Sequence, residues 1–248
     1  MSAETLTVSE PATAVEVRGL SKHFGSAAAL GGVDFSLPTG VFLTVFGPNG
    51  AGKTTLMRIL ATLARPTEGT VRVFGEDTLT APAQARRRIG LVTHRSLLYA
   101  SLSAFENVAF FARMFGVDDA AQRARAILSD LGLEHRMDDA VQTYSRGMEQ
   151  RCAIARALVH EPDVLLLDEP FSGLDPDARA RLRDLLVRPT DKPRTIILTS
   201  HDLTHGADLA DRVAILARGR LVFDAPAQDI PAGTMAEVYR EHTGARTT

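Results

Sequence analysis

The chain has 248 residues, of which 45% are hydrophobic and 23% charged, as in ordinary globular proteins and unlike disordered chains. Lysine and arginine number 28 against 30 aspartate and glutamate, so the net charge is −2 and no basic field favours nucleic acid as a partner. A single cysteine excludes an internal disulfide, and no apolar run is long enough to span a bilayer.

The N-terminal part of the chain predicts a leader, several strands and one helix. Residues 1–12 contain no lysine, no arginine and no apolar stretch, so they predict a disordered leader and not a secretory signal. After Gly52, apolar residues recur at helical spacing and stop before Pro66, which predicts a helix that reaches Leu63. Short alternating or apolar runs predict strands at residues 15–17, 33–37, 41–46, 70–74 and 89–93.

The rest of the chain predicts a helical insertion followed by a return to strands. Residues 103–115 and 120–131 have helical periodicity, whereas 163–167 and 195–199 are apolar runs too short for helices. Strands that alternate with amphipathic stretches indicate a buried parallel sheet. We therefore expect a single α/β domain over about 13–226, with a final helix and tail at 227–248. Its core lobe would take about 13–94 and 161–226, and its helical lobe about 95–160.

A glycine-rich loop at residues 47–54 fits the pattern G-x-x-x-x-G-K-[ST] between a predicted strand and a predicted helix. Glycines let consecutive N–H groups point at phosphate oxygens, and the helix adds its positive N-terminal end. Lys53 is predicted to reach the β- and γ-phosphates of ATP and Thr54 to bind Mg²⁺. A chance glycine-rich turn is the alternative, and the flanking elements count against it. The predicted nucleotide-binding residues here are Gly47, Pro48, Asn49, Gly50, Ala51, Gly52, Lys53, Thr54 and Thr55.

Two adjacent carboxylates, Asp168 and Glu169, end the apolar strand that begins at Val164. A strand-end aspartate of this kind holds Mg²⁺ in P-loop ATPases, and Asp168 is predicted to do so. Glu169 projects differently and is predicted to polarise the attacking water as general base. The alternative is a pair that caps the next helix, which the phosphate loop upstream makes less favourable.

Ser145 precedes a helix rich in alanine, isoleucine and leucine and is predicted to be its N-cap. The start of such a helix can bind an anion. Most caps of this kind are only structural, so the meaning of Ser145 depends on the motifs around it.

The order of these motifs resembles the nucleotide-binding subunits of ABC transporters over nearly the whole chain. The resemblance rests on the phosphate loop, the Ser-x-Gly helix start at 145–147, Leu-Asp-Glu-Pro at 167–170, Ser-Gly-Leu-Asp at 172–175 and Ser-His at 200–201. It implies a P-loop NTPase of the ABC ATPase type, with a mixed-sheet core lobe, an antiparallel β subdomain and a helical lobe. ATP and Mg²⁺ would be its ligands, and ATP hydrolysis its activity.

The same resemblance implies partners. Two such subunits, identical or different, would pair head to tail, with ATP held between the phosphate loop of one and Ser145 and Gly147 of the other. Transmembrane permease subunits would bind the pair at the cytoplasmic face of the membrane, through a groove in residues 97–111.

Residue by residue, Phe24 matches the aromatic that stacks on adenine, Asp175 the loop that crosses the dimer interface, and His201 the switch histidine at the γ-phosphate. Phe24 could instead lie in the core, and His201 could be structural. Two departures stand out. His94 takes the place of the usual glutamine and is predicted to act in catalysis and metal binding, and Arg146 and Met148 replace the usual glycine and glutamine of the signature.

A finer resemblance concerns residues 93–99, 105–108 and 144–148, which look like the ATP-binding subunit of the haem exporter of cytochrome c maturation. The same signature also occurs in subunits that export drugs, lipids or polysaccharides. A soluble ABC ATPase for cofactor assembly is a further alternative, distinguished by the absence of a membrane partner. A nucleotide sensor without activity would lack a general base, whereas Glu169 is present.

Overall fold

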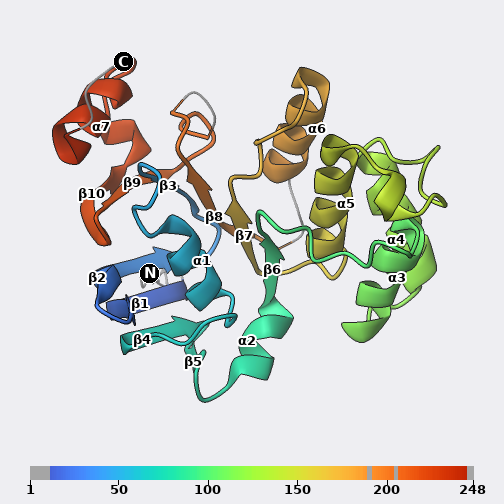
Figure 1. Ribbon diagram of the computed structural model, residues 1–248, viewed down its shortest axis with the longest axis horizontal. Coiled ribbons are helices and arrows are strands. Elements are labelled where there is room, and N and C mark those ends of the chain that lie inside the picture. Colours follow the sequence, from blue (N-terminus) through green and yellow to red (C-terminus); the bar gives the residue numbers. More distant parts are fainter. Residues whose placement is uncertain (1–11, 189–191, 204–205, 245–248) are drawn as a thin grey trace, which may run out of the picture.

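The computed structural model describes residues 12–188, 192–203 and 206–244 of the chain (Figure 1). Most of the predicted leader, residues 1–11, and the last residues of the tail, 245–248, lie outside the described residues. The strands are β1 (Thr13–Phe24), β2 (Ala27–Pro38), β3 (Phe42–Phe46), β4 (Glu68–Val73), β5 (Glu76–Asp77), β6 (Ile89–Val92), β7 (Val164–Asp168), β8 (Thr195–Ser200), β9 (Arg212–Ala217) and β10 (Arg220–Pro226). The α-helices are α1 (Lys53–Leu60), α2 (Pro82–Arg88), α3 (Ala104–Met114), α4 (Ala120–Asp130), α5 (Arg146–Leu158), α6 (Pro176–Val187) and α7 (Met235–Thr243).

The strands form two sheets. A four-stranded antiparallel sheet has the order β2-β1-β4-β5, and a six-stranded mixed sheet has the order β10-β9-β3-β8-β7-β6. From β9 to β6 the strands of the mixed sheet are parallel, and β10 is antiparallel to β9. Every residue of β3, β7 and β8 is buried, as expected for parallel strands covered on both faces. The mixed sheet therefore forms the centre of the molecule.

Helix α1 packs between the two sheets, in one apolar cluster with residues of both (Figure 1). It ends at Leu60 and not at the predicted Leu63. Thr62 adopts the left-handed backbone conformation, with φ of 60°, which ends the helix before Pro66 could disturb it. The phosphate loop is thus held between a central strand and a buried helix.

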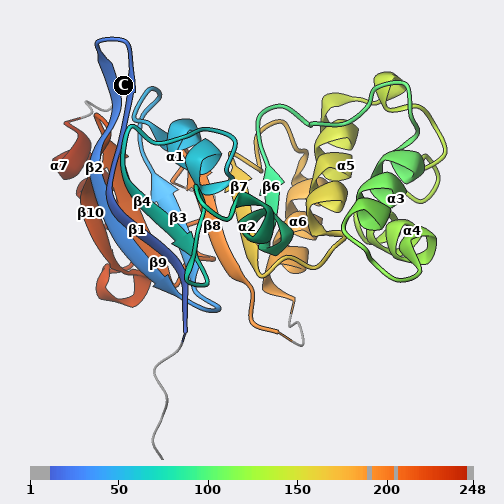
Figure 2. The ribbon, with the colours of Figure 1, turned by 90° about the horizontal axis from the view of Figure 1, so that it is seen from below.

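The helical lobe consists of α3, α4 and α5, which lie together on the far side of β6 and β7 from the antiparallel sheet (Figure 2). A capping box starts α3, because Ser103 Oγ accepts from the backbone N–H of Glu106 while the Glu106 side chain accepts from the N–H of Ser103. Cys152 is buried in the apolar cluster of this lobe.

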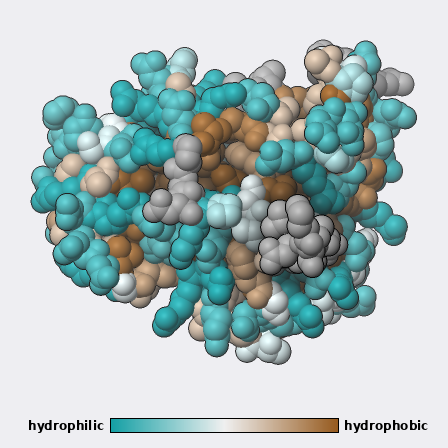
Figure 3. All heavy atoms as spheres, turned by 180° about the vertical axis from the view of Figure 1, so that it is seen from behind, coloured by the Kyte–Doolittle hydropathy of each residue, from teal (hydrophilic) through white to brown (hydrophobic). Residues whose placement is uncertain are grey.

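Two further properties of the molecule are the polarity of its surface and the character of its helices. On the back of the molecule, hydrophilic residues predominate and hydrophobic ones are interspersed among them (Figure 3). In the described part of the chain, no helix combines the length and the apolar character needed to cross a membrane.

Candidate functional site

The phosphate loop connects β3 to α1 and requires glycine at two positions. A methyl group on Gly47 would lie 2.3 Å from the carbonyl oxygen of Leu216. One on Gly52, which has φ of 107°, would lie 2.5 Å from the carbonyl oxygen of Ala29. Since backbone atoms cannot yield by that much, these glycines allow the loop to curl closely against its neighbours.

Lys53, the first residue of α1, points back into this loop. Its Nζ donates to the carbonyl oxygens of Gly47 at 2.6 Å and Pro48 at 3.3 Å, and lies 3.7 Å from Oε1 of Glu169. Only 7% of Lys53 is exposed, and this burial lowers the pKa of its ammonium, against the opposing effect of the carboxylates of Glu169 and Asp168. A buried cation inside a curled, glycine-rich loop is suited to bind phosphate oxygens.

Asp168 lies at the end of β7 and is 2% exposed. Its Oδ2 accepts from the hydroxyl of Thr54 at 2.8 Å, and its Oδ1 from the hydroxyl of Thr199 at 2.6 Å. The alternative that Asp168 caps the next helix is wrong, because Asp175 is the N-cap of α6.

The carboxylate of Asp168 and the hydroxyl of Thr54 form an oxygen set that fits Mg²⁺, which prefers one or two protein oxygens together with phosphate and water. Among the described residues, no group of three or more histidine, cysteine, aspartate or glutamate side chains could hold a metal ion.

Glu169 faces a different set of groups from its neighbour Asp168. Its backbone is in the left-handed region, with φ of 55°, which is unfavourable for a residue with a side chain. Its Oε1 lies 2.9 Å from Nδ1 of His201, the residue that follows β8. The structure thus brings Lys53, Asp168, Glu169 and His201 together at the carboxyl ends of β7 and β8.

His94 lies beside these carboxylates. It follows β6 and lines a cavity of about 390 Å³, as do Asp168 and Glu169. The complete lining is His94, Ser96, Arg146, Glu149, Gln150, Asp168, Glu169 and Ser172. A larger cavity of about 500 Å³ lies at the opposite ends of β7 and β8, and none of the described residues that line it is a predicted site residue.

The signature residues lie in the other lobe. Ser145 is the N-cap of α5, as predicted, and its Oγ accepts from the N–H of Met148 at 3.3 Å. Figures 1 and 2 show β6 and β7 between α5 and α1. Ser145 and Gly147 are therefore separated from the phosphate loop of their own chain.

Phe24 ends β1 and lies at the surface, with 56% of its area exposed. The alternative that it belongs to the core is therefore wrong. The ammonium of Lys22 lies 5.1 Å from the centre of its ring. An exposed aromatic ring beside a cation leaves one face free to stack on a planar ligand.

Three features of this region are not predicted from the sequence. The hydroxyl of Thr199 fixes Asp168, and the only signal for it is a polar residue in an apolar strand. Asn107 is fully buried in α3 and bonds both backbone groups of Tyr99. Ser96 donates to Glu149, which connects the loop of His94 to α5; nothing in their spacing indicates this contact.

Comparisons with known proteins agree with this geometry. Residues 30–172 match the family model of the ABC transporter. The chain is 37% identical over 233 residues to the daunorubicin/doxorubicin resistance ATP-binding protein DrrA of Streptomyces peucetius, covering 93% of this chain and 71% of that protein. It is 39% identical over 216 residues to the Nod factor export ATP-binding protein I of Burkholderia orbicola (strain AU 1054), covering 84% and 69%.

Solved structures agree as well. An ATP-binding subunit of an ABC transporter superposes with a TM-score of 0.86 at 28% identity, over 92% of this chain and 99% of that one. A dimeric ATP-binding cassette in a post-hydrolysis state, bound to ADP and Pi, superposes with a TM-score of 0.77 at 26% identity, over 86% and 98%. The predicted fold, a P-loop NTPase of the ABC ATPase type, is therefore confirmed, and the chain belongs to the ABC transporter family as a subunit that binds and hydrolyses ATP.

Proposed function

We propose that two copies of this subunit, or this chain and a similar one, clasp two Mg·ATP molecules and use their hydrolysis to drive export through a membrane permease. ATPase domains of this family dimerise and work with transmembrane permease subunits. The observation that carries the proposal is the separation of the two half-sites within one chain. Lys53 and Glu169 lie together in the core lobe, whereas Ser145 and Gly147 start α5 in the other lobe. A second chain in head-to-tail orientation would bring them together.

The catalytic groups have separate roles in this proposal. Lys53 and the N–H groups of the loop hold the β- and γ-phosphates, and stabilise the charge that develops during transfer. Thr54 and Asp168 would hold a magnesium ion, which would supply further positive charge to stabilise the phosphate oxygens. Glu169 accepts a proton from the attacking water, and His201, 2.9 Å from Glu169, orients that carboxylate and contacts the γ-phosphate.

Three further residues are assigned by position. Phe24 stacks on the adenine ring from its exposed site, and Asp175 lies in the loop that reaches across to the partner. His94 lines the cavity beside Asp168 and Glu169, where its imidazole would contact the metal or the water.

The permease would bind at an apolar surface of the helical lobe. Leu97, Tyr99, Phe110 and Met114 are all more than two fifths exposed, and the rings of Tyr99 and Phe110 meet edge to face. Buried Asn107 holds Tyr99 in place through its backbone. A rigid patch of exposed apolar side chains on a protein surface typically marks an interaction site. This binding would place the subunit at the cytoplasmic face of the membrane.

The cargo is proposed from the relatives. Two of them are named for drug resistance and Nod factor export, so we propose export of an amphipathic organic molecule. Haem export stays a prediction, supported by the resemblance of residues 93–99 and 144–148. Purification of the subunit with its permease from detergent, followed by ATPase assays with each class of cargo, would distinguish these substrates.

Glu169→Gln tests the mechanism. We expect this variant to bind Mg·ATP, to lose nearly all turnover, and to accumulate as an ATP-bound dimer, because the amide cannot accept the proton. Glu161→Gln, at an exposed carboxylate paired with Arg123, is the matched control and should hydrolyse ATP normally. Hydrolysis by Glu169→Gln at the wild-type rate would rule out Glu169 as the base.

A further inference from the structure

The first turn of α5 contacts two loops that belong to the catalytic site of its own chain. Ser96 Oγ donates to Oε1 of Glu149 at 2.5 Å, and Ser96 follows His94 by two residues. Gln150 Nε2 donates to the carbonyl oxygen of Pro170 at 3.3 Å, directly after Glu169. The helix that carries the signature is thus bonded to the loops that carry His94 and Glu169.

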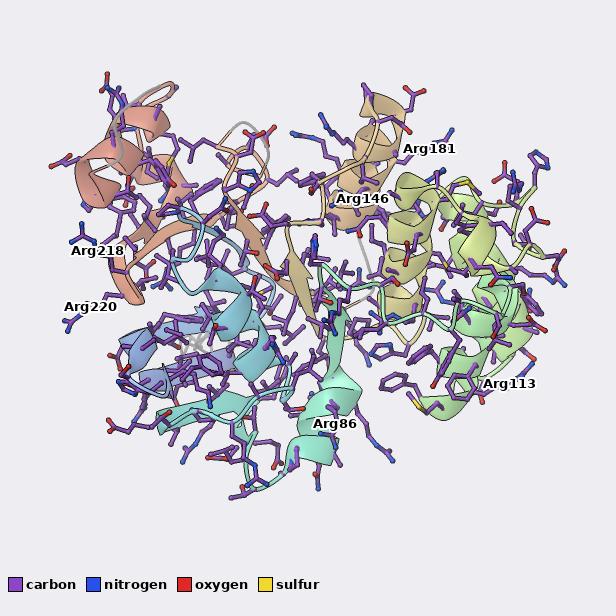
Figure 4. All side chains as sticks on the ribbon, in the orientation of Figure 1. Arg86, Arg113, Arg146, Arg181, Arg218 and Arg220 are labelled. Carbon is purple, nitrogen blue, oxygen red and sulfur yellow. The ribbon has the colours of Figure 1, made fainter. Side chains whose placement is uncertain are left out.

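Arg146 adds a third contact from the same turn. Its side chain crosses Gly173, whose φ is 77°, so closely that a methyl group there would lie 3.2 Å from Arg146 Nε. Figure 4 shows Arg146 between α5 and α6. The loop that leads from Glu169 to α6 is therefore packed against the start of α5.

Helix α5 is well placed to move as a rigid unit. Arg151 donates to the carbonyl oxygens of Leu131 and Gly132 at the end of α4, and most of the rest of α5 is buried in the helical lobe. A displacement at its first turn would therefore carry Glu149 and Gln150 with it. The partly buried Ser96–Glu149 hydrogen bond would transmit that displacement to the loop of His94.

We propose that this hydrogen bond couples the two ATP sites of the dimer. The inference rests on the proposed function, in which the start of α5 serves the nucleotide held by the partner chain. Binding of ATP by the partner chain fixes the position of α5. The hydrogen bond between Ser96 and Glu149 transmits this change to the loop of His94, and so to the nucleotide held by the same chain. The two residues are positioning residues, since neither has to touch ATP. The consequence is positive cooperativity in ATP concentration.

Ser96→Ala and Ser96→Thr test the coupling, because only the threonine retains the hydroxyl. ATP hydrolysis is measured against Mg·ATP concentration for the full chain. Wild type and Ser96→Thr should show Hill coefficients clearly above 1, the limit being about 2 for two sites. In Ser96→Ala the coefficient should fall clearly toward 1, since the hydrogen bond no longer couples α5 to the loop of His94. Thr93→Val is the matched control, because its hydroxyl donates to the carbonyl oxygen of Arg95 within the same loop and makes no hydrogen bond with α5 among the residues that the structure describes.

A second pair of variants protects the test against a folding defect at Ser96. Glu149→Gln keeps an oxygen that accepts from the serine hydroxyl and should stay cooperative, whereas Glu149→Ala should not. Retained cooperativity in both Ser96→Ala and Glu149→Ala overturns the proposal. A wild-type chain that hydrolyses ATP with a Hill coefficient of about 1 also overturns it, and leaves the proposed function intact. A wild-type chain that neither binds nor hydrolyses ATP overturns the proposed function itself.

Discussion

Asp168 and Glu169 are neighbours in sequence, yet their carboxylates contact different groups. Asp168 continues β7 and is fixed by the hydroxyls of Thr54 and Thr199. Glu169 leaves the strand with a left-handed backbone, which turns its carboxylate toward Lys53 and His201. The identity of both residues could be predicted from the motif. Their different surroundings, hydroxyls for Asp168 and charged side chains for Glu169, depend on a backbone angle that no spacing reveals.

His94→Gln is a prediction at the same scale. Mg²⁺ prefers oxygen ligands, and the amide of glutamine offers a neutral oxygen, whereas an imidazole offers nitrogen. We therefore expect His94→Gln to reach half-maximal ATP turnover at a lower Mg²⁺ concentration than the wild type, measured by ATPase assays over a series of Mg²⁺ concentrations.

His135→Gln is the control for this experiment, because the His135 side chain is 91% exposed and outside the site. Equal turnover and equal Mg²⁺ dependence in wild type and His94→Gln would contradict a weaker metal contact at His94.

At the scale of elements, prediction succeeded where a motif or a periodic pattern fixed the segment. The strand at 41–46, the helices starting near 104 and 120, and the strand at 195–199 correspond to β3, α3, α4 and β8. β9 and β10 are not among the predicted strands. β9 is an apolar run that periodicity alone does not distinguish from a helix, and β10 is stabilised by its antiparallel pairing with β9. Tertiary contacts of that kind leave no local signature.

The contacts at the junction between α3 and α5 allow us to predict how stability depends on pH. The ring of Phe115, which ends α3, stacks on the imidazole of His160 with centroids 3.9 Å apart. Burial lowers the pKa of His160 to about 4, and the charges of Arg156 and Arg194 add to this, while Asp163 opposes it. The folded protein therefore keeps this histidine neutral, whereas the unfolded chain protonates it below about pH 6.5.

The contribution of His160 to the free energy of unfolding is therefore fully present above pH 6.5 and is lost as the pH falls toward 4. When the pH is lowered from 7.5 to 5, we expect the wild type to lose about 2 kcal/mol of unfolding free energy because of His160. The variant His160→Phe should not show this loss. Phenylalanine preserves the stacking and carries no proton. Urea unfolding at both pH values measures the difference, and identical losses in the two proteins would contradict it.

At the scale of the whole molecule, the residues of the proposed composite site lie in two lobes. One chain supplies the phosphate loop with its carboxylates, and α5 presents Ser145 and Gly147 from the other lobe. The sequence motifs supply the candidate residues of both halves, but they indicate neither Thr199 beside Asp168 nor the contact of Ser96 with Glu149. Motif order identifies residues by type and spacing, whereas the spatial relation between the halves follows from the arrangement of the two lobes.

Complementation between defective chains tests the shared site directly. Lys53→Ala removes the phosphate-binding cation. Gly147→Asp places a negative charge where the partner's γ-phosphate would lie, and its Cβ would lie at an ordinary 3.5 Å from the carbonyl oxygen of Gly173. Each variant alone should be inactive. In an equal mixture, half of the dimers contain one intact composite site, so up to about a quarter of the wild-type ATPase rate should return.

The control replaces the Gly147→Asp chain by one that carries both substitutions. No dimer in that mixture has an intact site, so hydrolysis should stay at the background of the separate chains. Because the two mixtures contain the same total protein and differ only in whether an intact Lys53 faces an intact Gly147, their difference isolates the shared site. If the first mixture hydrolyses no more ATP than the sum of its components, each chain must use its own α5 or none, and the head-to-tail arrangement fails.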